Sequence, residues 1–157
     1  MTQQQRDLVH TILRNAPFDL GGVATLQRPL LEALLTAQPL PGDVHVTRTE
    51  LGGVPVAVAT LGGSAGILFH LHGGGFAVGS ALGSLGLATS LARRTGLSVV
   101  SVDYRLAPKH PFPAAADDVL AAYEALVERE GGAERIVVSG ESAGGNLAVG
   151  LDRKSVV

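Results

Sequence analysis

The 157-residue sequence contains no cysteine, which excludes disulfide bonds, thiol catalysis and cysteine-ligated metal sites. It also lacks any cluster of basic residues. Its 12 Lys and Arg and 14 Asp and Glu are scattered along the chain, and the formal net charge is −2. Nucleic acids and anionic membranes bind concentrated positive charge, so we expect neither as a partner.

Two further absences concern membranes and export. The N-terminus lacks the unbroken apolar run of a signal peptide, so we expect a cytoplasmic protein. Residues 51–92 contain no Asp, Glu, Lys or Arg, and a spanning helix needs about 20 mostly apolar residues. Glycine pairs, Pro55, a glycine triplet and two histidines interrupt this window. Such interruptions are typical of turns between short buried strands, so the sequence favours a globular core and no membrane span.

The N-terminal third of the chain shows two kinds of periodicity. Residues 3–15 and 24–37 carry apolar side chains at helical spacing, which predicts two surface helices ahead of the main domain. Residues 44–51 and 54–61 alternate with period two on either side of a glycine pair. This pattern predicts an antiparallel β-hairpin.

Strand and helix patterns alternate in the rest of the chain. Short apolar runs predict buried strands, and segments with capping signals predict the helices between them. The expected strands are residues 67–73, 97–104 and 135–140, and the expected helices are residues 84–96, 113–130 and 143–151. A leading hairpin followed by this alternation predicts an α/β fold with a mostly parallel sheet and helices on both faces.

The pattern G-x-S-x-G occurs twice, at residues 62–66 and 140–144. A nucleophile elbow needs a strand before the serine, a sharp turn of small residues and a helix after it. Residues 62–66 lie between two expected strands, so we expect a glycine-rich hairpin turn there. Residues 140–144 lie between a strand and a helix, which would hold the Ser142 hydroxyl out of the sheet. An ordinary strand-to-helix turn also uses small residues, so this motif alone leaves both interpretations open.

A second motif favours the catalytic interpretation. Three glycines follow His72 directly after an expected strand, and such a loop can turn its N–H groups inward. These donors suit the negative oxygen of a tetrahedral intermediate, where losing one lowers the rate by about 10² to 10³. A phosphate-binding loop is the rival, but the sequence has no G-x-x-x-x-G-K-[ST] and no acidic ribose partner at the expected distance.

Three motifs in order resemble one known family. They are HGGG from His72, DYRLAPKHPFPAAADD at residues 103–118, and GESAGGNLA from Gly140. Together they resemble the hormone-sensitive-lipase-like family of α/β-hydrolase carboxylesterases over roughly residues 20–150. The resemblance implies an α/β-hydrolase fold truncated after the nucleophile elbow. It also implies hydrolysis of small carboxylic esters through a serine acyl-enzyme, with no metal or organic cofactor.

The resemblance also implies roles for the motif residues. Ser142 would be the nucleophile. Three backbone N–H groups would form the oxyanion hole, those of Gly74, Gly75 and Ala143. His72 would shape the loop, and the remaining motif glycines would support the two turns, namely Gly73, Gly140 and Gly144.

The same resemblance divides the chain into three parts. Residues 1–40 would be N-terminal cap helices, and residues 41–151 would be the N-terminal half of the hydrolase domain. The last six residues, DRKSVV, change abruptly from an apolar helix to charge. They match one in-frame translation of a sequencing adapter, so we expect residues 152–157 to be a non-native tail.

Several other polar residues are expected to be structural. Asp103 and Arg105 follow a strand and would hold the adjoining loop through charged hydrogen bonds. His45 lies in the hairpin, His70 in a buried strand and His110 in a proline-rich connector. None of these three histidines is expected to act as a base.

The serine lacks its partners in this chain. A catalytic serine needs a base and an orienting acid, and in α/β hydrolases these follow the serine in the order acid, then histidine. After Ser142 there is no histidine and one acid, Asp152, about 15 Å along the same expected helix. We therefore expect no appreciable turnover by this chain. Two alternatives stay open: a non-catalytic scaffold or binding protein, and an acyltransferase.

Overall fold

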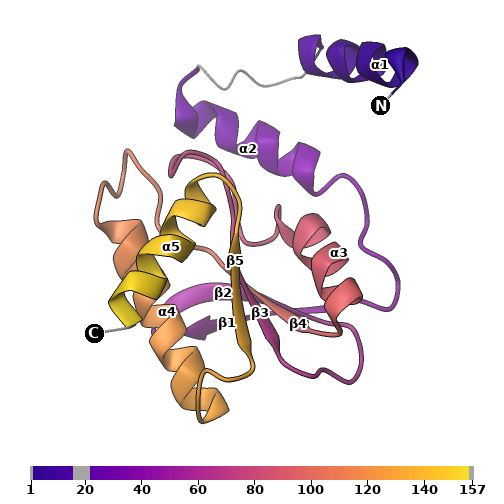
Figure 1. The fold of residues 1–157 in the computed structure, drawn as a ribbon. Helices are drawn as coiled ribbons and strands as arrows, with labels where there is room; N and C mark the ends of the chain where they lie inside the picture. Colours follow the sequence, from indigo (N-terminus) through magenta and orange to yellow (C-terminus); the bar gives the residue numbers. More distant parts are fainter. Residues whose placement is uncertain (1, 16–21, 156–157) are drawn as a thin grey trace.

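A five-stranded sheet forms the centre of the fold (Figure 1). The computed structural model describes residues 2–15 and 22–155, with side chains as far as residue 151. The side chains of the predicted non-native tail, residues 152–157, therefore lie outside the described part. The strands are β1 (His45–Leu51), β2 (Val54–Thr60), β3 (Ile67–Leu71), β4 (Ser98–Val102) and β5 (Ile136–Gly140).

The sheet has the strand order β1-β2-β4-β3-β5. β2 pairs antiparallel with both β1 and β4, whereas β3 pairs parallel with β4 and with β5. Four strands therefore run in one direction and β2 runs against them. This confirms the mostly parallel sheet with a leading antiparallel hairpin.

Helices cover both faces of the sheet, as the sequence predicted. They are α1 (Gln3–Arg14), α2 (Ala24–Leu35), α3 (Leu85–Thr95), α4 (Ala114–Glu130) and α5 (Ala143–Ser155). α3 packs on one face, and α4 and α5 pack side by side on the other (Figure 1). Gly96 and Gly131 end α3 and α4 in the left-handed conformation that favours glycine.

Strand β3 is buried because it lies between β4 and β5 and because helices cover both faces of the sheet. Phe69 and Leu71 face the core under α4 and α5, whereas Leu68 faces the core under α3. Side chains alternate between the two faces of a strand. The consecutive apolar residues Leu68 and Phe69 therefore serve two cores, which explains why β3 does not alternate between apolar and polar residues.

The segment at residues 62–66 corrects one expectation. It is not a hairpin turn, because β2 and β3 pair with opposite sides of β4 and the segment crosses from one to the other. The Ser64 hydroxyl accepts the N–H of Ser98 at 2.8 Å and also contacts the Gly66 carbonyl. This serine therefore ties the crossover to the start of β4, which is a structural role.

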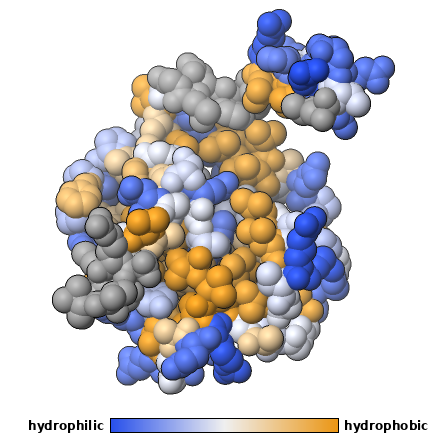
Figure 2. Space-filling model, in the orientation of Figure 1, coloured by the Kyte–Doolittle hydropathy of each residue, from blue (hydrophilic) through white to orange (hydrophobic). Residues whose placement is uncertain are grey.

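Much apolar surface remains uncovered in this chain. On α2 the apolar stripe that gives the helical spacing points outward, with Leu26 66%, Leu30 41% and Leu34 45% exposed. β5 lies at the edge of the sheet, and its Val137 is 50% exposed. Figure 2 shows hydrophobic residues gathered on the face that β5 crosses. Among the described residues, no helix combines the length and apolar character needed to cross a membrane.

Candidate active site

Ser142 occupies a sharp turn between β5 and α5, and we call residues 140–144 the elbow. Its φ is 51°, in the left-handed region that residues with a side chain rarely adopt. Gly144 N–H donates to the Glu141 carbonyl at 2.8 Å, and Asn146 N–H donates to the Ser142 carbonyl at 3.2 Å. The serine is exposed while Ala143 beside it is buried. The structure thus has the strand, turn and helix that a nucleophile elbow requires.

The two elbow glycines lie where backbone segments approach closely. A Cβ added to Gly140 would lie 2.3 Å from the Gly144 carbonyl oxygen. A Cβ added to Gly144 would lie 2.0 Å from the carbonyl oxygen of Leu71 on β3. Both distances are far below van der Waals contact. Glycine at these positions therefore lets α5 start directly against the end of β3.

The unusual backbone of Ser142 leads to a stability prediction. Replacing Ser142 by glycine is expected to raise the free energy of unfolding by about 1 kcal/mol, because glycine adopts a positive φ without steric strain. Urea unfolding followed by circular dichroism measures this change. Ser142→Ala is the matched control, since it removes the hydroxyl but keeps the Cβ, and its stability should equal that of the original chain. Equal stability of all three proteins would contradict strain at this position.

A second turn abuts the elbow, and we call residues 72–78 the glycine loop. Gly73 N–H donates to the Glu141 carboxylate at 3.4 Å. A Cβ added to Gly73 would lie 3.4 Å from the Cβ of Ser142. The start of the glycine loop is therefore packed against the serine turn, although the two segments are about half the chain apart in sequence.

The glycine loop itself is tightly wound. Gly74, Gly75 and Phe76 have φ values of 117°, 59° and 60°, and the N–H groups of Ala77 and Val78 both donate to the Gly74 carbonyl at 3.0 Å. Within the described part of the chain, no hydrogen-bond acceptor is recorded for three N–H groups near the elbow, those of Gly74, Gly75 and Ala143. These groups are available to an external acceptor.

His72 holds the base of the glycine loop. Its imidazole is buried and stacks on the Tyr104 ring, with centroids 4.1 Å apart and planes 7° apart. Burial lowers the pKa of His72, so the ring is neutral, and Nδ1–H donates to the Gly73 carbonyl at 2.7 Å. The Tyr104 hydroxyl donates to the His72 carbonyl at 2.6 Å. The histidine is therefore engaged by the loop backbone and by an aromatic ring.

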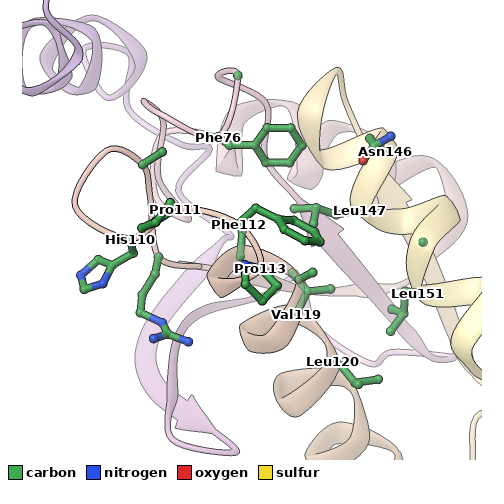
Figure 3. A pocket seen from close by; sticks show the side chains of 16 residues that line it. Phe76, His110, Pro111, Phe112, Pro113, Val119, Leu120, Asn146, Leu147 and Leu151 are labelled. Atoms are coloured by element: carbon green, nitrogen blue, oxygen red, sulfur yellow. The ribbon is translucent and has the colours of Figure 1, made fainter.

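The other three histidines before the elbow that were considered as possible bases lie in different surroundings. His70 is buried, its Nδ1 is 2.8 Å from the Ser139 hydroxyl, and burial lowers its pKa. His45 is an exposed residue of β1. His110 lies in the connector before α4, and in Figure 3 its ring points away from the nearby phenyl rings. None of the three is brought to the Ser142 hydroxyl by a recorded hydrogen bond within the described residues.

Asp103 and Arg105 hold loops, as expected. The Asp103 carboxylate accepts the N–H of Ala81 at 3.0 Å, at the approach to α3. Arg105 donates from Nε and Nη2 to the carboxylate of Asp118 on α4, at 2.9 Å and 2.7 Å. These contacts fix the loop after β4 against both helical layers.

The general base and acid of a triad are not assembled by the described residues. The sequence has no histidine after Ser142, and the side chain of Asp152 lies outside the described part. Among the described side chains, no group of three or more His, Asp or Glu is placed to hold a metal ion. Among the described residues, the site therefore offers the exposed Ser142 hydroxyl and nearby backbone N–H groups.

Sequence reasoning missed an apolar pocket beside the glycine loop. Its volume is about 570 Å³, and it lies between α4, α5 and the connector that precedes α4. Figure 3 shows the rings of Phe76 and Phe112 among its lining residues, beside Leu147 of α5 and Val119 of α4. Phe112 is 91% exposed, between two prolines. An aromatic residue in a proline-rich connector was the available signal in the sequence.

Comparison with known proteins places this geometry in a family. Residues 68–155, more than half of the chain, match a family described as having the α/β hydrolase fold. An esterase of Acinetobacter venetianus is 36% identical over 136 residues, which covers 86% of this chain and 45% of the esterase. The ethyl acetate hydrolase of Pseudomonas putida is 42% identical over 110 residues, covering 68% of this chain and 34% of that protein.

Solved structures agree with this result. The crystal structure of a hormone-sensitive lipase from a metagenome library is 39% identical, with a TM-score of 0.87 over 96% of this chain and 52% of that one. The chain thus spans about half the length of this structure and of the Acinetobacter venetianus esterase. The fold, the order of the motifs and these similarities together show that the chain belongs to the hormone-sensitive-lipase-like family of α/β hydrolases.

Proposed function

We propose that this chain carries the nucleophile and oxyanion hole of a carboxylic ester hydrolase. The observation that carries the proposal is the exposed Ser142 at positive φ, packed against a glycine loop. Among the described residues, the Gly74 and Gly75 N–H groups of this loop have no recorded acceptor. Residues held in rarely populated backbone conformations cluster at active sites. In nucleophilic catalysis such a turn presents the serine hydroxyl to the substrate.

The chemistry follows from the donors and the nucleophile. The Ser142 oxygen attacks the ester carbonyl carbon, and the carbonyl oxygen becomes an oxyanion that accepts hydrogen bonds from three N–H groups, those of Gly74, Gly75 and Ala143. The bond between the acyl carbon and the alkoxy oxygen then breaks, that oxygen receives the proton lost by the Ser142 hydroxyl, and the alcohol leaves while the acyl group stays on Ser142. Water hydrolyses this acyl-enzyme, releases the acid and restores the serine hydroxyl.

We propose small acyl esters as the substrates. The support is the curated relative named for ethyl acetate hydrolysis and the apolar pocket that begins at Gly75 and Phe76. An apolar pocket next to the oxyanion donors suits an uncharged ester.

We propose that the 157-residue polypeptide by itself is inactive. The two histidines nearest the elbow are buried, and each has Nδ1 in a hydrogen bond, His70 with Ser139 and His72 with Gly73. Neither has a recorded contact with Ser142 in the described residues. General-base catalysis contributes about 10² to 10⁴ in rate, so the serine without its base is a weak nucleophile.

A chimaeric enzyme tests the proposal. It joins residues 1–151 of this chain to the part of the Acinetobacter venetianus esterase that follows the segment matched here. The chimaera should hydrolyse p-nitrophenyl acetate, and Ser142→Ala in it should lower kcat by roughly 10⁴ or more. The 157-residue chain should show no turnover above its own Ser142→Ala variant.

Two results would contradict this proposal. Sustained turnover by the 157-residue chain, lost in Ser142→Ala, would show that it needs no further base. A folded chimaera whose hydrolysis is unchanged by Ser142→Ala would show that the serine is not the nucleophile and would favour a binding scaffold.

A further inference from the structure

Helix α2 meets the glycine loop through charged side chains. In α2, all of which the structure describes, no residue is fully buried, and the leucine stripe points to solvent. The half-buried face instead carries Arg28 and Glu32, one helical turn apart. Figure 1 shows α2 lying across the end of the sheet at which β5 turns into α5. The face of α2 that carries Arg28 and Glu32 therefore packs toward the glycine loop.

Arg28 binds two backbone carbonyls on two different loops. Its Nε–H donates to the Ala77 carbonyl at 2.7 Å, and its Nη2–H donates to the Ala107 carbonyl at 2.5 Å. The same loops are joined directly, because the Ala107 N–H donates to the Phe76 carbonyl at 2.8 Å. The guanidinium thus joins α2, the glycine loop and the loop after β4 at one point.

The position of this contact in the glycine loop is significant. Ala77 follows three successive residues with positive φ, of which Phe76 carries a side chain. A non-glycine residue in this region is strained and persists only where surrounding contacts fix it. Arg28 binds the carbonyl of the Ala77–Val78 peptide, one peptide beyond Phe76 and at the opposite end of the turn from Gly74.

Glu32 supplies a second contact on the same face of α2. Its carboxylate accepts the hydroxyl of Ser80, and that hydroxyl also accepts the N–H of Gly83 at 2.9 Å. The segment from Ala77 to Ser80 is therefore held by α2 at both ends. Glu32 binds beyond the turn, whereas Arg28 binds the turn itself.

We propose that Arg28 is a positioning residue for the oxyanion hole, acting by holding the Ala77 carbonyl and so the turn that presents the N–H groups of Gly74 and Gly75. This inference rests on the proposed function of those two donors. Arg28 has no recorded contact with Ser142 within the described residues. It acts on the reaction through the conformation of the loop.

Hydrogen exchange of the 157-residue chain tests the structural half of the proposal. In Arg28→Ala, peptides that cover residues 74–78 should exchange roughly tenfold faster or more, because two charge-assisted hydrogen bonds are lost. Peptides from β3 and β4 should keep their exchange rates. Arg28→Lys should restore only part of the protection, because an ammonium group lacks the two-pronged geometry of guanidinium. Arg94→Ala, at an exposed position on α3, is the matched control and should change neither region.

Hydrogen exchange also distinguishes an effect of Arg28 on the glycine loop from a role of Arg28 only in anchoring α2. Ser80→Ala breaks the Glu32 contact but leaves the Arg28 contacts in place. If it speeds exchange at residues 74–78 as much as Arg28→Ala does, the proposal is overturned. Unchanged exchange there in Arg28→Ala, or an equal increase in β3 and β4, also overturns it.

Kinetics in the chimaera test the functional half. Arg28→Ala should lower kcat by roughly tenfold and change KM less than about twofold, because oxyanion donors act on the transition state. An unchanged kcat would overturn the proposed role. A chimaera with no Ser142-dependent activity would instead refute the proposed function. Hydrogen exchange of the 157-residue chain would still test whether Arg28 holds the glycine loop, because that measurement does not depend on activity.

Discussion

Replacing Gly144 by alanine is expected to destabilise the protein by more than about 4 kcal/mol, a large part of the stability of a typical domain. The new Cβ would lie 2.0 Å from the Leu71 carbonyl oxygen, 2.5 Å from its carbon and 2.6 Å from the His72 carbonyl oxygen. All three atoms belong to the backbone at the end of β3, so no side-chain rotation relieves the clash. α5 would have to move away from the sheet.

The neighbouring glycine provides the control for this result. A Cβ added to Gly145 meets no atom closer than the Gly140 carbonyl oxygen at 3.4 Å. Gly145→Ala should therefore stabilise α5 by about 0.5 to 1 kcal/mol through its higher helix propensity. Urea unfolding of both variants, followed by circular dichroism, measures the difference. Similar stability of the two variants would contradict the close contact between α5 and β3.

Replacing Gly74 by alanine is expected to reduce ester hydrolysis by the chimaera about 10² to 10³-fold, the effect of losing one oxyanion donor. At φ 117° a side chain is strongly disfavoured, and the added Cβ would lie 2.1 Å from the Val78 carbonyl oxygen. The glycine loop cannot keep its present turn with this substitution. The N–H groups of Gly74 and Gly75, the proposed oxyanion donors, would then be displaced.

Gly75→Ala is the matched comparison for the Gly74 substitution. Gly75 also has a positive φ, 59°, but an added Cβ there meets nothing within 4 Å. Its backbone strain should lower stability by about 1 kcal/mol and lower kcat far less than Gly74→Ala does. Steady-state kinetics with p-nitrophenyl acetate measure both variants. Equal losses of kcat would show that strain alone, and not the contact with Val78, controls the loop.

The fold was largely predictable because its signals are local. Period-two alternation on either side of a glycine pair predicted the β1–β2 hairpin, and apolar runs predicted β3, β4 and β5. Glycines at the ends of α3 and α4 predicted where these helices stop. The strand, small-residue turn and helix around Ser142 were also readable, because the backbone restricts residue type at each of these positions.

Other features depended on contacts that local patterns do not encode. The same G-x-S-x-G pattern at residues 62–66 became a crossover, because strand pairing places β4 between β2 and β3. The helical spacing on α2 was read from Leu26, Leu30 and Leu34, yet the opposite, charged face meets the body of the protein. Periodicity shows that a segment is helical and has two faces, but only packing decides which face is covered.

The sequence by itself determined the family, the order of strands and helices, and the candidate nucleophile Ser142, because motif glycines and apolar periodicity are constraints on nearby backbone. Only the tertiary structure decided that the glycine loop packs against the elbow, with Gly73 beside Ser142. It also decided that Arg28 reaches the Ala77 and Ala107 carbonyls, 49 and 79 residues away in sequence. Such contacts arise where strands of a sheet end at a common edge, and their partners are set by chain topology.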